Sequence, residues 1–76
     1  MTTAYDNILI FKSNIRTEGD KDVVSMAFDN HPFVEKWCVD MDDEERILRV
    51  VSARMDKKQV IDLVNACGYS CEELMD

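Results

Sequence analysis

The spacing of hydrophobic residues changes along the chain, and the order of these changes restricts the fold to a few architectures. Residues 5–12 form a short aliphatic and aromatic run that ends at Ser13–Asn14, as in a central strand covered on part of both faces. The next segment has apolar positions at i, i+3, i+4 and i+7, which predict one face of a helix: Val24, Ala27, Phe28 and His31. Thr17 or Asp20 can cap the start of this helix, and Pro32 stops it.

The middle of the sequence predicts a β-hairpin with an acidic turn. Residues 34–41 alternate in character, with Trp37, Val39 and Met41 on one side and Cys38 and Asp40 on the other. Residues 47–53 read as the next strand, and the acidic segment 42–45 connects the two. We expect this turn to be a solvated loop, because it lacks the glycine and the twelfth-position glutamate of a calcium loop.

The second helix has the clearest pattern in the chain. Its apolar stripe again follows the i, i+3, i+4, i+7 spacing: Val60, Leu63, Val64 and Cys67. Asp56 and Gln59 resemble a capping box at its start, and Gly68 stands where a helix-ending glycine belongs. Residues 69–75 alternate weakly and predict a last strand, with Cys71 pointing inward.

The resulting order, β-α-β-β-α-β, is that of the ferredoxin-like α+β plan. We therefore expect a four-stranded antiparallel sheet with two helices on one face and with the other face left to solvent or a partner. Seventy-six residues suffice for one compact domain, which we place at 1–76.

Composition narrows the function classes. A net charge of −7 opposes nucleic-acid binding, which needs clustered Lys and Arg. Apolar runs such as Ile8–Phe11 are too short to span a bilayer, and the N-terminus lacks the features of a signal peptide. Three cysteines, an odd number, favour free thiols in a reducing compartment. These features predict a cytoplasmic protein without membrane insertion.

Two stretches resemble the heavy-metal-associated domains of copper chaperones and metal-pumping ATPases. They are residues 24–41, which look like the family's first helix, Leu-Pro-Gly-Val turn and Val-Asp strand, and residues 62–69, which look like its second helix and Gly-Tyr ending. The family carries a G-M-x-C-x-x-C metal loop before the first helix. In this sequence Asn14–Ile15 stand at Gly-Met, and Thr17 and Asp20 stand at the two cysteines. The resemblance implies a degenerate member that lacks both metal thiolates.

The presence of Thr17 and Asp20 at the positions of the two cysteines predicts that the chain has no tight Cu(I) site and no cofactor. Cu(I) prefers soft sulfur ligands, whereas Thr17, Glu18 and Asp20 offer only oxygen. Asp20 with Glu18 remains a weak candidate for a harder cation; the simpler interpretation is that Thr17 and Asp20 cap the helix. Arg16 further disfavours a cation, while Ile15 can keep the buried anchoring role of the family's methionine.

The remaining thiols and the single histidine do not rebuild a site. Cys67 and Cys71 lie on opposite sides of a glycine turn, with a spacing longer than that of two-thiolate clips, so we expect them in the core. Cys38 is a candidate reactive thiol if its face of the strand is exposed. We expect His31 to be a cap or surface residue.

Catalysis is not expected, because the sequence has no recognisable nucleophile–base pair, phosphate loop or arginine loop of the acylphosphatase kind. The third strand also lacks the paired aromatics of RNA-binding sheets. The sequence favours a protein-interaction module that docks a partner or a second copy through the loop before the first helix and through the open face or edge strand of the sheet. The candidate residues are Asn14, Ile15, Arg16, Thr17, Trp37, Cys38 and Tyr69. The alternative is altered metal binding through Asp20 and Glu18 or through cysteines from two chains.

Overall fold

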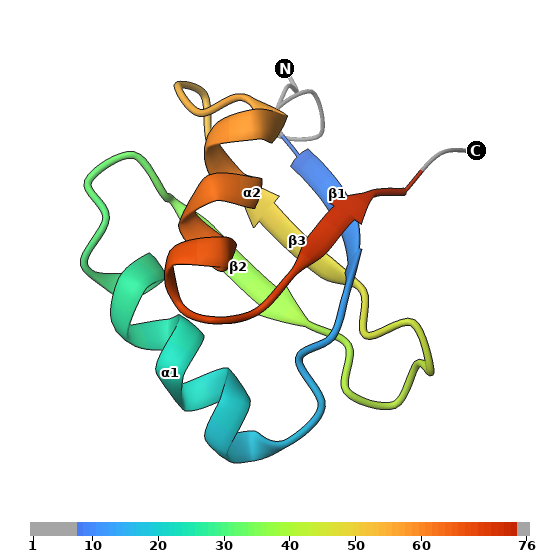
Figure 1. Cartoon of the computed structure of the whole chain (residues 1–76). Helices are drawn as coiled ribbons and strands as arrows, with labels where there is room; N and C mark the ends of the chain where they lie inside the picture. Colours follow the sequence, from blue (N-terminus) through green and yellow to red (C-terminus); the bar gives the residue numbers. More distant parts are fainter. Residues whose placement is uncertain (1–7, 75–76) are drawn as a thin grey trace.

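The computed structural model describes residues 8–74, and it confirms the predicted order of elements (Figure 1). The elements, in chain order, are β1 (Ile8–Ser13), α1 (Glu18–Asp29), β2 (Lys36–Val39), β3 (Leu48–Val51), α2 (Lys57–Ala66) and β4 (Cys71–Glu73). Neither helix in the described part of the chain is long and apolar enough to cross a membrane.

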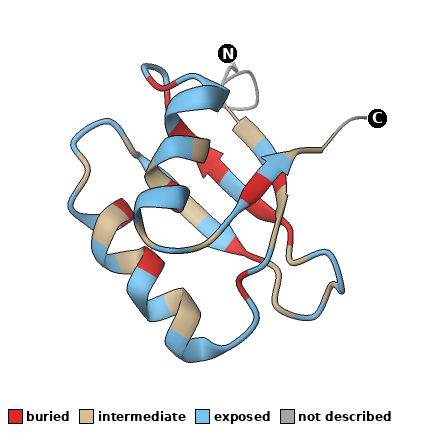
Figure 2. Cartoon of the chain, in the orientation of Figure 1, coloured by how far each residue is buried: buried red, intermediate tan, exposed pale blue. Residues whose placement is uncertain are grey.

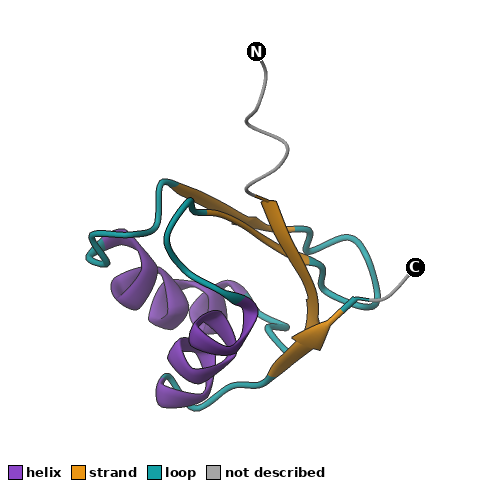
Figure 3. Cartoon of the chain, turned by 90° about the horizontal axis from the view of Figure 1, so that it is seen from above, coloured by secondary structure: helices purple, strands orange, loops and turns teal. Residues whose placement is uncertain are grey.

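The four strands form one antiparallel sheet in the order β2-β3-β1-β4. Both helices lie on the same face of this sheet, and nothing among residues 8–74 covers the other face (Figure 3). The predicted ferredoxin-like α+β architecture is therefore confirmed.

The element boundaries differ from the predicted ones by a few residues. Residues 5–7 of the first predicted strand lie outside the described part of the chain, and Ser13 belongs to the strand because it pairs with Cys71 of β4. Helix α1 ends at Asp29, so His31, which the sequence pattern places at the end of the helix's apolar face, lies outside the helix. Asn30 ends the helix instead, since its side-chain amide donates to the Met26 carbonyl at 2.7 Å.

The core lies between the helices and the covered face of the sheet (Figure 2). Its fully buried side chains come from β1, the loop after it, α1, β3 and α2: Phe11, Ile15, Val24, Phe28, Leu48, Val50, Val60 and Val64. Each contributes about 1.5–3 kcal/mol through the removal of apolar surface from water. Cys71 is buried as predicted, whereas Cys67 is only partly so.

Both helices start with a capping box. Thr17 and Asp20 form the first and Asp56 and Gln59 the second; in each, two side chains bond backbone N–H groups that the helix leaves free. Helix α2 is followed by Gly68 with φ of +94°, a backbone conformation that residues with a Cβ rarely adopt.

We predict that Gly68→Ala lowers the free energy of unfolding by about 1 kcal/mol through backbone strain alone. An added Cβ meets no atom within 4 Å at this position, so no packing clash contributes. Gly19→Ala in the first turn of α1 is the matched control, and it should be neutral or stabilising by up to about 1 kcal/mol. Urea denaturation measures both; equal effects of the two changes would contradict the assignment.

Candidate functional site

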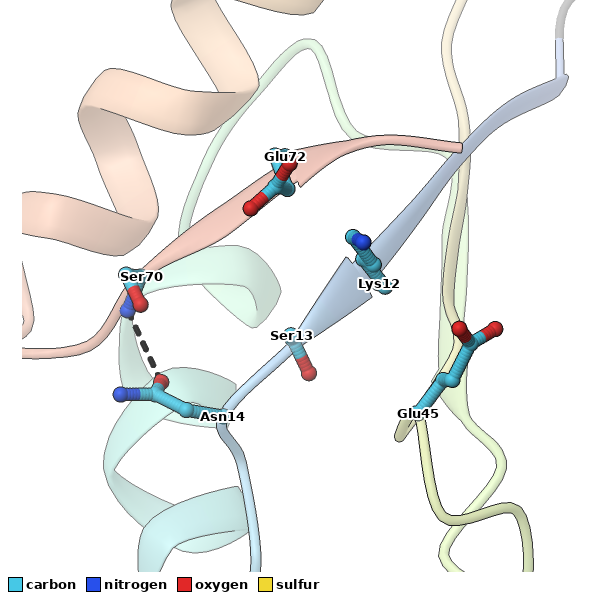
Figure 4. A pocket seen from close by; sticks show the side chains of 6 residues that line it. All are labelled: Lys12, Ser13, Asn14, Glu45, Ser70 and Glu72. Carbon is cyan, nitrogen blue, oxygen red and sulfur yellow. Dashed lines mark hydrogen bonds between the residues drawn. The ribbon is translucent and has the colours of Figure 1, made fainter. Parts of the chain in front are cut away.

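Three loops meet at the end of the sheet where β1 stops. We call this region the loop end; it consists of residues 14–17, 40–47 and 67–70. The Ser13 hydroxyl donates to the Arg46 carbonyl at 2.7 Å, which joins the first loop to the acidic hairpin. The Ser70 amide donates to the Asn14 side-chain oxygen at 2.9 Å, which joins it to the third loop (Figure 4).

Thr17 and Asp20, which the sequence resemblance places at the positions of the family's metal cysteines, bond to each other's backbone. The Asp20 amide donates to Thr17 Oγ1 at 3.0 Å, and the Thr17 amide donates to Asp20 Oδ2 at 3.1 Å. The Arg16 amide also donates to Oδ2, at 3.1 Å. The capping role predicted for Thr17 and Asp20 is therefore confirmed.

Asp20 also connects the start of α1 to the loop after α2. The Tyr69 hydroxyl donates to Asp20 Oδ1 at 2.7 Å, across 49 residues of sequence. We call this carboxylate and its three donors, from Arg16, Thr17 and Tyr69, the latch. The Tyr69 bond is the main cause that lowers the pKa of Asp20 below 3.8, and the same bond raises the pKa of Tyr69.

These residues do not fit Cu(I). Both carboxylate oxygens of Asp20 and the hydroxyl of Thr17 already accept hydrogen bonds from the protein itself, and oxygen is a poor ligand for this soft ion. Within residues 8–74, no cluster of three or more His, Cys, Asp or Glu side chains is arranged to hold a metal ion.

The thiols of the C-terminal part are held in the protonated form. Burial raises the pKa of Cys71 to about 11 and also raises the pKa of Cys67. Because the thiolate is the metal ligand and the nucleophile, these shifts lower the reactivity of both groups at neutral pH.

Two carboxylates of the acidic hairpin loop accept hydrogen bonds from the loop's own backbone. Asp40 Oδ1 accepts from the Asp42 amide at 3.1 Å, and Asp43 Oδ1 accepts from the Glu45 amide at 2.8 Å. Arg46, at φ of +48°, donates from its guanidinium to the carbonyls of Met41 and Asp43. These bonds give the segment the character of an ordered turn.

A shallow polar hollow of about 210 Å³ lies beside the loop end (Figure 4). Its lining mixes cationic, anionic and neutral groups: Lys12, Ser13, Asn14, Glu45, Ser70 and Glu72. The balance of one ammonium against two carboxylates indicates no single class of ligand.

The structure brings together only part of the predicted docking set. Asn14, Arg16, Thr17 and Tyr69 gather at the loop end, and the first three are exposed. Ile15 is fully buried, so it anchors the loop as predicted and offers no surface to a partner.

Two predicted docking residues lie elsewhere. The Trp37 indole N–H donates to Asp29 at 2.8 Å, at the far end of α1, roughly 18 Å along the helix from Thr17. Cys38 is exposed, as a reactive thiol requires, but it lies on the uncovered face of the sheet.

His31 is partly buried and accepts a hydrogen bond from the Phe33 amide at 3.1 Å, which is a local turn contact.

Sequence reasoning missed the Asn14–Ser70 and Asp20–Tyr69 contacts. Both link the β1–α1 loop to the α2–β4 loop, and no local spacing signals a pair so distant in sequence. The family resemblance carried the available signal for the Asp20–Tyr69 contact, because it places Asp20 in the metal loop and Tyr69 in the Gly-Tyr ending.

Solved structures with a similar fold include domains of copper chaperones and of a copper transporter. The first domain of the human copper chaperone for SOD1, in its Cu(I)-loaded form, matches with a TM-score of 0.75 and 17% identity over 87% of this chain and 89% of that chain. The apo HMA domain of a copper chaperone for superoxide dismutase matches at 0.76 and 16% identity, over 90% of this chain and 66% of that one.

The yeast copper transporter domain Ccc2a matches at 0.75 and 14% identity, over 92% of this chain and 97% of that chain. No family model and no curated protein matches the sequence significantly. The chain therefore has the fold of heavy-metal-associated domains, as the sequence resemblance predicted. The sequence identities are low enough that the likeness concerns the fold alone.

We predict that Tyr69→Phe raises the pKa of Asp20 toward 3.8, because the lost hydroxyl is the largest cause of its depression. A depressed folded-state pKa stabilises the protein above the unfolded-state pKa, and this contribution is lost as the pH falls through the folded-state pKa. The latch should thus weaken below about pH 3.8.

Carbon-detected NMR titration of the Asp20 carboxyl measures this pKa. Tyr5→Phe, which removes the chain's other tyrosine hydroxyl, is the matched control and should leave the Asp20 titration unchanged. An unaltered Asp20 titration in Tyr69→Phe would rule out the hydrogen bond in solution.

Proposed function

We propose that this domain is a non-catalytic protein-interaction module with the fold of a heavy-metal-associated domain, and that it docks a partner protein through the loop end. Metal transfer is not part of this role. The proposal places the protein in the cytoplasm, because its three cysteines are free thiols of the kind that a reducing compartment maintains.

The observation that carries the proposal is the use of the Asp20 carboxylate. A metal loop presents ligand atoms with free acceptor sites, whereas two backbone amides and a tyrosine hydroxyl fill three of the roughly four acceptor sites of the Asp20 carboxylate. A cation at Asp20 would therefore compete with these donors. The same bonds fix the shape of the loop without any ion.

A pre-ordered loop favours docking. Binding costs less when the surface is already in its bound shape, because less conformational freedom is lost on association. At the loop end, Asn14 is fixed to Ser70, and Arg16 and Thr17 are fixed to Asp20 through their backbones. The exposed side chain of Arg16 then offers a guanidinium for a carboxylate of the partner.

The copper-chaperone and transporter domains with this fold are the basis for the alternative, altered metal binding. In that reading Asp20 and Glu18 would hold a hard cation, or cysteines from two chains would meet. The bonded state of Asp20 and the burial of Cys71 favour the interaction module instead.

We predict that the reduced protein binds Cu(I), Zn(II) and Ni(II) too weakly to compete with a chelator of micromolar affinity. The double variant Thr17→Cys/Asp20→Cys is the positive control, since it restores two thiolates at the loop positions and should gain Cu(I) binding. Backbone amide shifts of residues 14–20 report binding in both proteins. Shifts of these amides in the unmodified protein at micromolar metal would overturn the proposal.

Docking at the loop end is tested by site-specific photo-crosslinking in cell extract. A crosslinker at the exposed position 44 of the loop end should capture a discrete partner, and one at the exposed position 65 on α2 should not. Arg16→Glu, with the crosslinker kept at position 44, should abolish the adduct. Light scattering over a range of concentrations decides whether the captured partner is a second copy. Equal capture from positions 44 and 65 would count against this surface.

A further inference from the structure

The uncovered face of the sheet carries a distinct surface. We call it the open sheet face; it consists of the strand residues that point away from the helices, among them Ile10, Lys12, Lys36, Cys38, Arg49 and Val51. Side chains alternate between the faces of a sheet, and residues paired in register share a face. Arg49 pairs with Ile10 on one side and with Cys38 on the other, and Val51 pairs with Lys36.

This face is cationic, although the chain is acidic. The whole sequence has sixteen Asp and Glu against nine Lys and Arg, yet the strand residues of the open sheet face carry Lys12, Lys36 and Arg49 against the single carboxylate of Glu72. Lys12 shares its hollow with Glu72 and with Glu45 of the hairpin loop, so the excess positive charge lies at Lys36 and Arg49. The carboxylates are concentrated in the helices and the loops instead.

The three cations have no ion-pair partner within the described range 8–74. The two ion pairs found there join α2 to β4 through Lys57 and Glu73, and Lys58 to Asp62 within α2. Glu72 lies opposite Lys12 in register without forming a pair. The sheet thus gathers unpaired positive charge on one side of a molecule that has carboxylates in excess.

Apolar surface lies between these cations. Ile10, on the central strand β1, is 37% exposed, and Val51 is partly exposed beside it. A partner that covers the face can therefore remove apolar area from water and also pair charges with the cations that lie beside it.

We propose that the open sheet face docks an acidic amphipathic segment of a partner protein, most simply a helix with an apolar stripe flanked by carboxylates. Such a helix laid on the sheet contacts Ile10 and Val51 with its stripe and offers carboxylates to Lys36 and Arg49. This surface is separate from the loop end, so the proposal goes beyond the function proposed above and does not depend on it.

Two other occupants fit less well. A symmetric dimer through this face would set cations against cations, because such an interface apposes the same patch from both copies. Single-stranded nucleic acid stacks its bases on aromatic side chains, whereas the aromatic residues of the described strands, Phe11 and Trp37, pair with residues of the covered face.

The test uses a synthetic peptide as probe: fifteen residues with leucines at helical i, i+3, i+4 spacing and glutamates elsewhere, added to the reduced, isotope-labelled protein at low salt. We expect amide shifts confined to β1, β2 and β3, at least tenfold weaker binding for Lys36→Glu/Arg49→Glu, and weakening by added salt. Lys57→Glu/Lys58→Glu changes the net charge equally on α2 and should bind as the unmodified protein does.

Lys36→Gln/Arg49→Gln provides a second variant in case the charge reversal prevents folding, and it should also weaken binding. The proposal is overturned by shifts centred on another surface, by equal binding of a peptide with lysines in place of the glutamates, or by equal losses in the two double-Glu variants. It is also overturned if an oligouridylate binds this face as tightly, or if light scattering shows a dimer that the Lys36/Arg49 change disrupts.

Discussion

The carboxylate of Asp20 joins three parts of the chain: the turn after β1, the start of α1 and the segment after α2. Its oxygens accept from the Arg16 and Thr17 amides, which close the turn after β1 and start α1, and from the Tyr69 hydroxyl, which fixes the segment after α2. The hydrophobic core holds the helices on the sheet without this group. The shape of the loop end depends on it, and so does the conclusion that this loop does not present metal ligands.

The fold and the loop chemistry are separable in this protein. The fully buried residues come mainly from the helices and strands, so the packing does not depend on which side chains stand at Thr17 and Asp20. Ile15 is the loop residue that belongs to the core, and it anchors the segment from below. Hydrogen bonds can thus order this loop in a domain with the fold of copper-chaperone domains. The open sheet face lies outside this arrangement and has its own charge pattern.

Local sequence signals predicted the helices and strands, because the residues that define each element lie within a few positions of one another. The Asp56–Gln59 capping box is an example: both residues are visible in sequence, and the structure has the bonds. The Asp20–Tyr69 bond spans 49 residues and follows from how the helices pack, which no spacing reveals. Trp37 shows the same limit, since the sequence predicts it as a docking residue whereas its indole bonds to Asp29 of α1. The cations that share the open sheet face likewise depend on strand register.

Hydrogen exchange at the Arg16 and Thr17 amides tests the latch most directly. Both amides donate to Asp20, so they should exchange more slowly than unbonded exposed amides and should lose this protection in Asp20→Ala. Amides of β3, such as that of Val50, should keep their protection in the same variant. Exchange of the Arg16 and Thr17 amides at the unprotected rate in the unmodified protein would show that these amides do not donate to Asp20. The latch described above would then not order the loop.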